Sequence, residues 1–284
     1  MTARPSRPAD PAFDGTSYAA ATAHHRAHDD EVLAPVRWRA GLRVLDVGCG
    51  VGDLTRSLAD LVAPGGEVLG VDASASQVDV ARAGGARPDV RFAVARVQDL
   101  DAVVPDGWAD VVVSVATLHW VPEADQPRAH DRLARVLAPG GTLRLDQGGA
   151  GQIGSARPVL DDVAAAHGLG PSPWFFPDAR TLGDLLAGAG LVVDDVRLVR
   201  QRRALPDRDA MAAWLVSQVL PGYLRGPDAP RGEDRRALER AAVAACATAL
   251  RRADGSYDQD YVRAQALARA PLGGSRVDRA TAYP

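Results

Sequence analysis

Short runs rich in β-branched residues alternate with helical patterns from residue 43 onward, and this alternation most limits the folds open to the chain. The strand-like runs are "RVLDV", "EVLGV", "VRFAVA", "ADVVVSVA" and "TLRLDQ". The helical patterns between them are "DLTRSLADLV", "SASQVDVARAG" and "QPRAHDRLARVL", while "APGGEV" and "APGGTL" predict caps and turns before the next strand. Strands joined through helices of this length predict an α/β fold with a parallel, doubly wound sheet.

The later part of the chain is less regular. Residues 147–178 carry glycines, prolines and the aromatic cluster "PWFFP", after which "RTLGDLLAGAG" and "LVVDDVRLVRQRR" predict a sixth helix and strand. Residues 206–253 favour helices interrupted by "PGYLRGPDAPRGED", and "YVRAQALARA" favours a last strand. We expect the two late insertions to cover the ends of the strands.

Composition excludes several classes of protein. The 284 residues are 46% hydrophobic and carry a net charge of −3, which suits one sizeable core and disfavours nucleic-acid binding. The N-terminus lacks an apolar signal region and no apolar run is long enough to cross a membrane, so we expect a soluble, cytoplasmic protein without a membrane partner. Cys49 and Cys246 are the only cysteines, too few for a disulfide framework or a cysteine zinc site.

A glycine-rich loop follows the first predicted strand in "VLDVGCGVGDLT". Gly48, Gly50 and Gly52 allow a ligand to approach the backbone at the carboxyl end of the strand. A dinucleotide fingerprint needs a third glycine where this chain has Asp53, which disfavours a nicotinamide oxidoreductase. Asp46 would repel a pyrophosphate, whereas it suits a nucleoside that carries a positive ammonium or sulfonium group.

Asp72 ends the second predicted strand in "VLGVDAS", about twenty residues after the loop. An acid at this place can accept both hydroxyls of a ribose. The alternative is a surface carboxylate that caps the following helix.

Four motifs in this order resemble the class I S-adenosylmethionine-dependent methyltransferases: "VLDVGCGVGDLT", "VLGVDAS", "DVVVSVATLHWV" and "RVLAPGGTL". The similarity covers about residues 40–146. It implies a Rossmann-like doubly wound sheet of seven strands with the last strand antiparallel, helices on both faces and a small helical cap. It also implies S-adenosyl-L-methionine as the cofactor.

The resemblance further implies a set of cofactor-binding residues. The loop backbone would contact the methionine part of the cofactor, and Asp46 would hold its amino group. Asp72 would accept from the ribose hydroxyls. Arg26 would pair with the methionine carboxylate, and Tyr18 would close over the cofactor. Arg96 stands where the family has an acid for the adenine amino group, and an arginine cannot accept that hydrogen bond. The full set is Tyr18, Arg26, Asp46, Gly48, Cys49, Gly50, Asp72, Ala73, Ser74, Gln77, Val97, Gln98, Ser114 and Val115.

His119 and Trp120 follow the fourth strand, close to where the methyl group would leave. His119 is the candidate catalytic residue, either as a general base or as a hydrogen-bond donor, and the alternative is a structural histidine. Enzymes that methylate base amines of nucleic acids typically carry an Asn or Asp followed by two prolines here. This chain has neither proline, which disfavours such acceptors.

The segments "LHWV", "PWFFP" and "DGSYDQDYVRAQALA" resemble the branch that contains trans-aconitate methyltransferase. The implied reaction is O-methylation of a carboxylate on a small molecule. The alternatives are C-, N- or phenolic O-methylation in secondary (natural-product) metabolism, or a regulatory protein that binds the cofactor without catalysis. Candidate substrate-binding residues are Trp120, Trp174, Phe175, Trp214 and Arg263.

His24, His25 and His28 lie close together, yet no further ligand pattern joins them, so we expect no metal. We expect residues 1–17 to form a mobile leader and residues 18–284 a single methyltransferase domain. Within it, the cofactor-binding core covers about 40–146 and the cap about 147–178 and 206–256. A monomer or homodimer is expected.

Overall fold

The computed structural model describes residues 26–201, 203–224 and 229–273, with side chains from residue 30 onward. Tyr18, His24 and His25 lie outside the described residues, as do the side chains of Arg26 and His28. The roles predicted for them therefore stay predictions.

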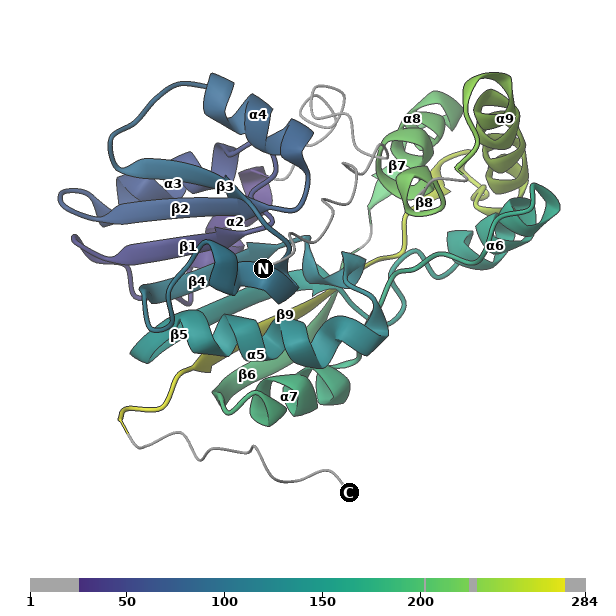
Figure 1. The fold of residues 1–284 in the computed structure, drawn as a ribbon. Helices are drawn as coiled ribbons and strands as arrows, with labels where there is room; N and C mark the ends of the chain where they lie inside the picture. Colours follow the sequence, from purple (N-terminus) through teal and green to yellow (C-terminus); the bar gives the residue numbers. More distant parts are fainter. Residues whose placement is uncertain (1–25, 202, 225–228, 274–284) are drawn as a thin grey trace, which may run out of the picture.

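A seven-stranded sheet runs through the molecule in the order β3-β2-β1-β4-β5-β9-β6 (Figure 1). The first five strands pair in parallel, whereas β9 lies between β5 and β6 and is antiparallel to both. This order confirms the predicted doubly wound sheet with an antiparallel last strand. The strands are β1 (Arg43–Val47), β2 (Glu67–Asp72), β3 (Val90–Val94), β4 (Ala109–Val115), β5 (Leu137–Gly148), β6 (Val192–Gln201) and β9 (Tyr261–Arg269).

Neighbouring residues of each strand point to opposite sides of the sheet, so apolar side chains lie on both faces. Helices cover both faces for this reason. In β1, Val44 packs with Leu33 of α2 and Leu58 of α3, while Leu45 belongs to the core shared with α5 and α7. The helices that flank the sheet are α2 (Arg26–Leu33), α3 (Asp53–Val62), α4 (Ala75–Ala83), α5 (Gln126–Val136) and α7 (Ala179–Gly188).

The strand β5 begins earlier than the sequence pattern predicts. The run expected as a turn, "LAPGG", is already part of the strand, and Leu137 pairs with Ala109. A register shift follows at Ala109/Val111, and Gly140 adopts φ +74°. The glycine thus shapes an irregular strand in place of the expected helix cap.

The two late insertions come together as a cap with its own hydrophobic core, beside the sheet (Figure 1). Leu160 and Trp174 from the first insertion pack with Met211 and Cys246 from the second. The cap elements are α6 (Ala156–Ala166), β7 (Ala204–Leu205), α8 (Arg208–Trp214), a π-helical turn (Leu215–Val219), a 3-10 turn (Leu220–Gly222), α9 (Gly232–Ala249) and β8 (Tyr257–Asp258).

The loop between β1 and α3 requires its glycines. Gly48, Gly50 and Gly52 have φ of +82°, +54° and +84°, the left-handed region that L side chains rarely adopt. A Cβ atom on Gly48 would also lie only 1.8 Å from Oγ1 of Thr117, which follows β4. The loop therefore packs directly against the end of the neighbouring strand.

Alanine substitution separates strain from collision. Gly41 has nearly the same backbone angle as Gly48, φ +81°, but no described atom lies within 4 Å of a Cβ added there. We therefore expect Gly41→Ala to lose about 1–2 kcal/mol of stability from backbone strain alone. Gly48→Ala adds the collision with Thr117, and we expect about 1–3 kcal/mol more. Denaturant unfolding of both variants measures the difference, and equal losses would contradict the packing of the loop on Thr117.

Candidate functional site

Asp72 joins the glycine loop to the start of α4. Its carboxylate accepts hydrogen bonds from the backbone N–H of Gly50 at 3.0 Å and of Ser74 at 2.8 Å. The N-cap of α4 is Ser74, whose hydroxyl accepts from the N–H of Gln77. Asp72 is therefore not the helix cap, and its carboxylate lies at the carboxyl edge of the sheet between two loops.

Burial raises the pKa of Asp72 above the usual aspartate range, although the backbone N–H groups of Ser74 and Gly50 oppose that shift. Desolvation disfavours the charged form, so further hydrogen-bond donors at this carboxylate stabilise it. Ribose hydroxyls are donors of this kind.

Gln77 places an unpartnered acceptor at the same loop. Its buried Oε1 atom has no hydrogen-bond partner in the described ranges of the chain and lies 3.0 Å from the position of a Cβ on Gly50. A buried oxygen of this kind indicates a missing donor. Asp72 and Gln77 thus offer acceptors beside the half-buried loop, which fits the hydroxyl and amino groups of a nucleoside.

Asp46 has a partner that the sequence analysis missed. Its side chain is 1% exposed and accepts a hydrogen bond from Oγ1 of Thr55 in α3 at 2.7 Å. This bond holds the start of α3 against the end of β1. A direct contact between Asp46 and the amino group of the cofactor stays a prediction.

Cys49 is a buried thiol in the loop. Burial raises its pKa well above the usual range, and the nearby carboxylates Asp46 and Asp72 add to the shift. The neutral form therefore persists, which suits a small residue filling a tight loop and not a nucleophile.

Arg96 and the remaining residues of the predicted cofactor-binding set have separate surroundings. Arg96 is exposed and pairs with Asp99, whereas Val97 belongs to the core. Gln98 donates to Asp125 at 3.1 Å. Ser114 is buried and donates to the carbonyl of Val47 at 2.9 Å, so its hydroxyl ties β4 to β1. Val115 is half-buried and packs beside the α2/α3 core, and Ala73 is exposed.

The ring of His119 extends the ladder between β4 and β5. The β4 strand ends at Val115, and the next residue, Ala116, still donates its N–H to the carbonyl of Asp146 but has φ +57°. The next N–H of β5 in the ladder, that of Gly148, donates to Nδ1 of His119 at 3.3 Å. Because Nδ1 accepts this bond, the neutral imidazole carries its proton on Nε2.

A chain of aromatic rings connects His119 to the cap. The His119 ring lies 5.5 Å from Trp120 and 5.7 Å from Phe176, and Trp174 lies 5.5 Å from both Trp120 and Tyr223. The backbone N–H of Phe175 donates to the carbonyl of His119. Phe176 was missed by the sequence analysis, which selected its neighbour in "PWFFP"; in an extended segment the two rings face opposite sides.

Three predicted substrate residues are less available than expected. Trp174 and Trp214 are 6% and 7% exposed and form the core of the cap. Arg263 is 3% exposed, and its guanidinium pairs with the carboxylate of Asp146. The prediction that Arg263 itself binds the carboxylate of an acceptor is therefore disfavoured, because Asp146 already neutralises its charge.

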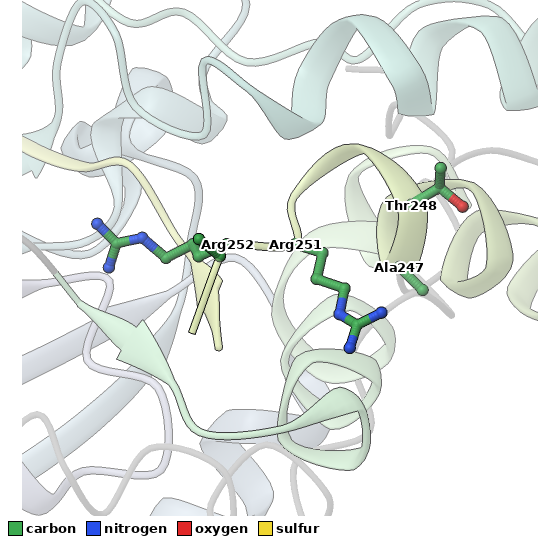
Figure 2. A pocket seen from close by; sticks show the side chains of 5 residues that line it. Ala247, Thr248, Arg251 and Arg252 are labelled. Carbon is green, nitrogen blue, oxygen red and sulfur yellow. The ribbon is translucent and has the colours of Figure 1, made fainter. Parts of the chain in front are cut away.

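A hollow at the end of α9 has a volume of about 540 Å³ and is lined by Ala247, Thr248, Arg251, Arg252 and Ala253. Figure 2 shows the first four of these side chains. None of the predicted site residues lines this hollow. Across the described ranges, no group of three or more His, Cys, Asp or Glu side chains is arranged to hold a metal ion. Within the same part of the chain, no helix has both the length and the apolar character to span a membrane.

Comparison with known proteins agrees with this geometry. Residues 44–141 match the family model described as a methyltransferase domain. The chain is 32% identical over 222 residues to a trans-aconitate 2-methyltransferase of Deinococcus radiodurans, which covers 72% of this chain and 80% of that protein. It is 31% identical over 206 residues to nocamycin O-methyltransferase of Saccharothrix syringae, covering 65% and 71%.

The solved structure of phosphoethanolamine N-methyltransferase 2 of Haemonchus contortus, in complex with S-adenosyl-L-methionine, has the same fold. It superposes with a TM-score of 0.57 at 16% identity and covers 90% of this chain and 56% of that one. The similarity to the relative of Deinococcus radiodurans establishes the family, and the order of the strands agrees with it. The chain belongs to the class I S-adenosylmethionine-dependent methyltransferases and is an enzyme that uses S-adenosyl-L-methionine as its methyl donor.

Proposed function

We propose that this methyltransferase transfers its methyl group to a carboxylate oxygen of a small acid. The relative of Deinococcus radiodurans is named for trans-aconitate, an organic acid. A carboxylate is already ionised at neutral pH, so the transfer needs orientation more than deprotonation.

The geometry at His119 supports this acceptor most directly. Its Nδ1 atom accepts from the N–H of Gly148, so the neutral ring carries its proton on Nε2, which is then a donor atom and not a base. A donor suits a carboxylate acceptor, whereas a base for a hydroxyl or amine would need a vacant ring nitrogen.

We place the cofactor site at the same edge of the sheet, where the parallel strands have their carboxyl ends. We assign the ribose hydroxyls to Asp72, the adenine side to Ala73, Ser74 and Gln77, and the methionine part to the loop at Gly48 and Gly50. The bound cofactor supplies an electrophilic sulfonium methyl group. The buried charge of Asp46 lies behind the loop and favours a positively charged ligand there.

The cap, about residues 147–178 and 206–256, is proposed to select the acceptor and to exclude water. Its aromatic residues Trp174 and Phe176 reach His119 directly or through Trp120. A water-poor site strengthens hydrogen bonds to the reacting oxygen.

A second candidate is O-methylation of a natural product, supported by the similarity to nocamycin O-methyltransferase. A screen with isotope-labelled methyl donor over organic acids and extracted metabolites separates the two. We expect a product whose label is released by mild alkali, as for a methyl ester. A label that resists alkali because it sits on carbon, nitrogen or an ether oxygen would contradict the carboxylate proposal.

Replacing Asp72 tests the cofactor site. Asp72→Ala removes the proposed ribose acceptor, so we expect S-adenosylmethionine binding to weaken by about 1–3 kcal/mol, the range for hydrogen bonds to a charged group. Calorimetry gives the affinity, and Asp79→Ala is the control because that carboxylate lies on α4 with its side chain 73% exposed. Equal affinities for the two variants would remove Asp72 from the site.

Two substitutions distinguish a donor from a base at His119. Glutamine can accept from Gly148 and donate from its amide, so we expect His119→Gln to keep turnover within a few-fold of wild type, and His119→Ala to lower it about ten-fold. Loss of a general base costs about 10²–10⁴-fold for either variant. Steady-state rates at saturating substrates distinguish the two roles, and the cofactor affinity of each variant checks that it is folded. Turnover abolished in both variants would refute the donor role.

A further inference from the structure

Polar side chains gather on one face of the sheet where β9 begins. Tyr261, Arg263 and Gln265 alternate along β9 and therefore point to the same face. Asp146 of β5 lies directly opposite Gln265 in the register. Its carboxylate accepts from Nε of Arg263 at 2.5 Å and from Nε2 of Gln265 at 2.8 Å, so these groups satisfy one another.

Tyr261 is not satisfied in this way. Its side chain is 7% exposed, and its buried hydroxyl has no hydrogen-bond partner among the residues that the structure describes. A buried hydroxyl without a partner is costly, so this position indicates a missing ligand atom or water.

Two guanidinium groups lie against the Tyr261 ring. Cζ of Arg203 is 3.7 Å from the ring centroid, and Cζ of Arg263 is 5.4 Å from it. Arg263 is neutralised by Asp146, whereas Arg203 has no carboxylate within ion-pair distance among the described residues. The neighbouring Asp260 is engaged through its side chain with the N–H of Ser155, and Asp258 pairs with Arg252. Within the described part of the chain, the cluster therefore carries one positive charge that no carboxylate compensates, next to an unpartnered hydroxyl.

This cluster adjoins the residues around His119. Gly148, which donates to His119, is the register partner of Arg263. A Cβ on Gly148 would lie 2.6 Å from Phe176, so that ring covers the same sheet face. With about 4.8 Å between strands and about 3.4 Å per residue, Tyr261 lies roughly 7–10 Å from Gly148 across the sheet, the length of a small acid.

We propose that the Tyr261 hydroxyl and the Arg203 guanidinium bind a second carboxylate of the acceptor while its first carboxylate receives the methyl group. This assignment rests on the proposed carboxylate methylation and narrows it to acids with two or more carboxylates. Arginine and a phenol hydroxyl both donate to carboxylate oxygens. Arg263, held by Asp146, is a positioning residue for the Tyr261 ring.

The test compares dicarboxylates with monocarboxylates of equal length, glutarate with pentanoate and adipate with hexanoate, together with trans-aconitate. Tyr261→Phe keeps the ring and removes only the hydroxyl, and Arg203→Gln removes the charge. For the acids with several carboxylates we expect each variant to raise KM about ten-fold or more, with kcat and cofactor affinity nearly unchanged. The monocarboxylates should show no change in KM. Arg251→Gln removes an exposed arginine elsewhere in the cap and should match wild type for every acid.

Two results would overturn the inference. If the enzyme methylates acids but the variants affect mono- and dicarboxylates alike, the subsite is wrong while carboxylate methylation stands. If wild type methylates none of these acids or any other carboxylic acid, both proposals fail. Unchanged cofactor affinity in Tyr261→Phe and Arg203→Gln shows that the variants are folded.

Discussion

The placement of β9 between β5 and β6 determines how the late part of the chain meets the site. Arg263 and Gln265 of β9 both donate to the buried carboxylate of Asp146 of β5 on one face of the sheet. A shift of one residue in this register would turn Arg263 toward the apolar face, where Ala264 and Leu145 pack with α7, and would leave Asp146 buried without a partner. An unpaired buried charge is strongly unfavourable, so the ion pair specifies the register. That register brings Tyr261 and the end of the cap beside Gly148 and His119.

The opposite side of the site depends on close packing of backbone. The loop of Gly48, Gly50 and Gly52 lies between Thr117 and Gln77, and only glycine fits these positions without strain. Behind the loop, Asp46 and Asp72 supply two carboxylates, one fixed by Thr55 and one by the N–H groups of Gly50 and Ser74. The site thus combines negative charge toward the cofactor with a positive charge at Arg203, near the proposed acceptor. This separation suits transfer of a methyl group from a cation to an anion.

The sequence predicted the sheet and the cofactor loop because both depend on local patterns. Strand periodicity, the glycine spacing and the acid that ends β2 are visible within a few residues of one another. The cap and its contacts were harder, since they join segments that are distant in the sequence, such as Leu160 with Met211 and Trp174 with Cys246. Arg263 was chosen for its charge, but nothing in "YVRAQ" indicates that Asp146 lies opposite it. Thr55, Phe176 and Tyr261 were missed for the same reason: their importance comes from a hydrogen bond, a ring contact or an unsatisfied hydroxyl that only the fold creates.

The central claim is that the enzyme orients an already ionised oxygen and needs no general base. The dependence of kcat on pH, measured with both substrates saturating, tests this claim most directly. Because a carboxylate stays ionised throughout, we predict a flat profile from about pH 6 to about pH 9. A rate that rises about ten-fold per pH unit below an apparent pKa in this range, and loses that dependence in His119→Gln, would show that a base is required and contradict the claim.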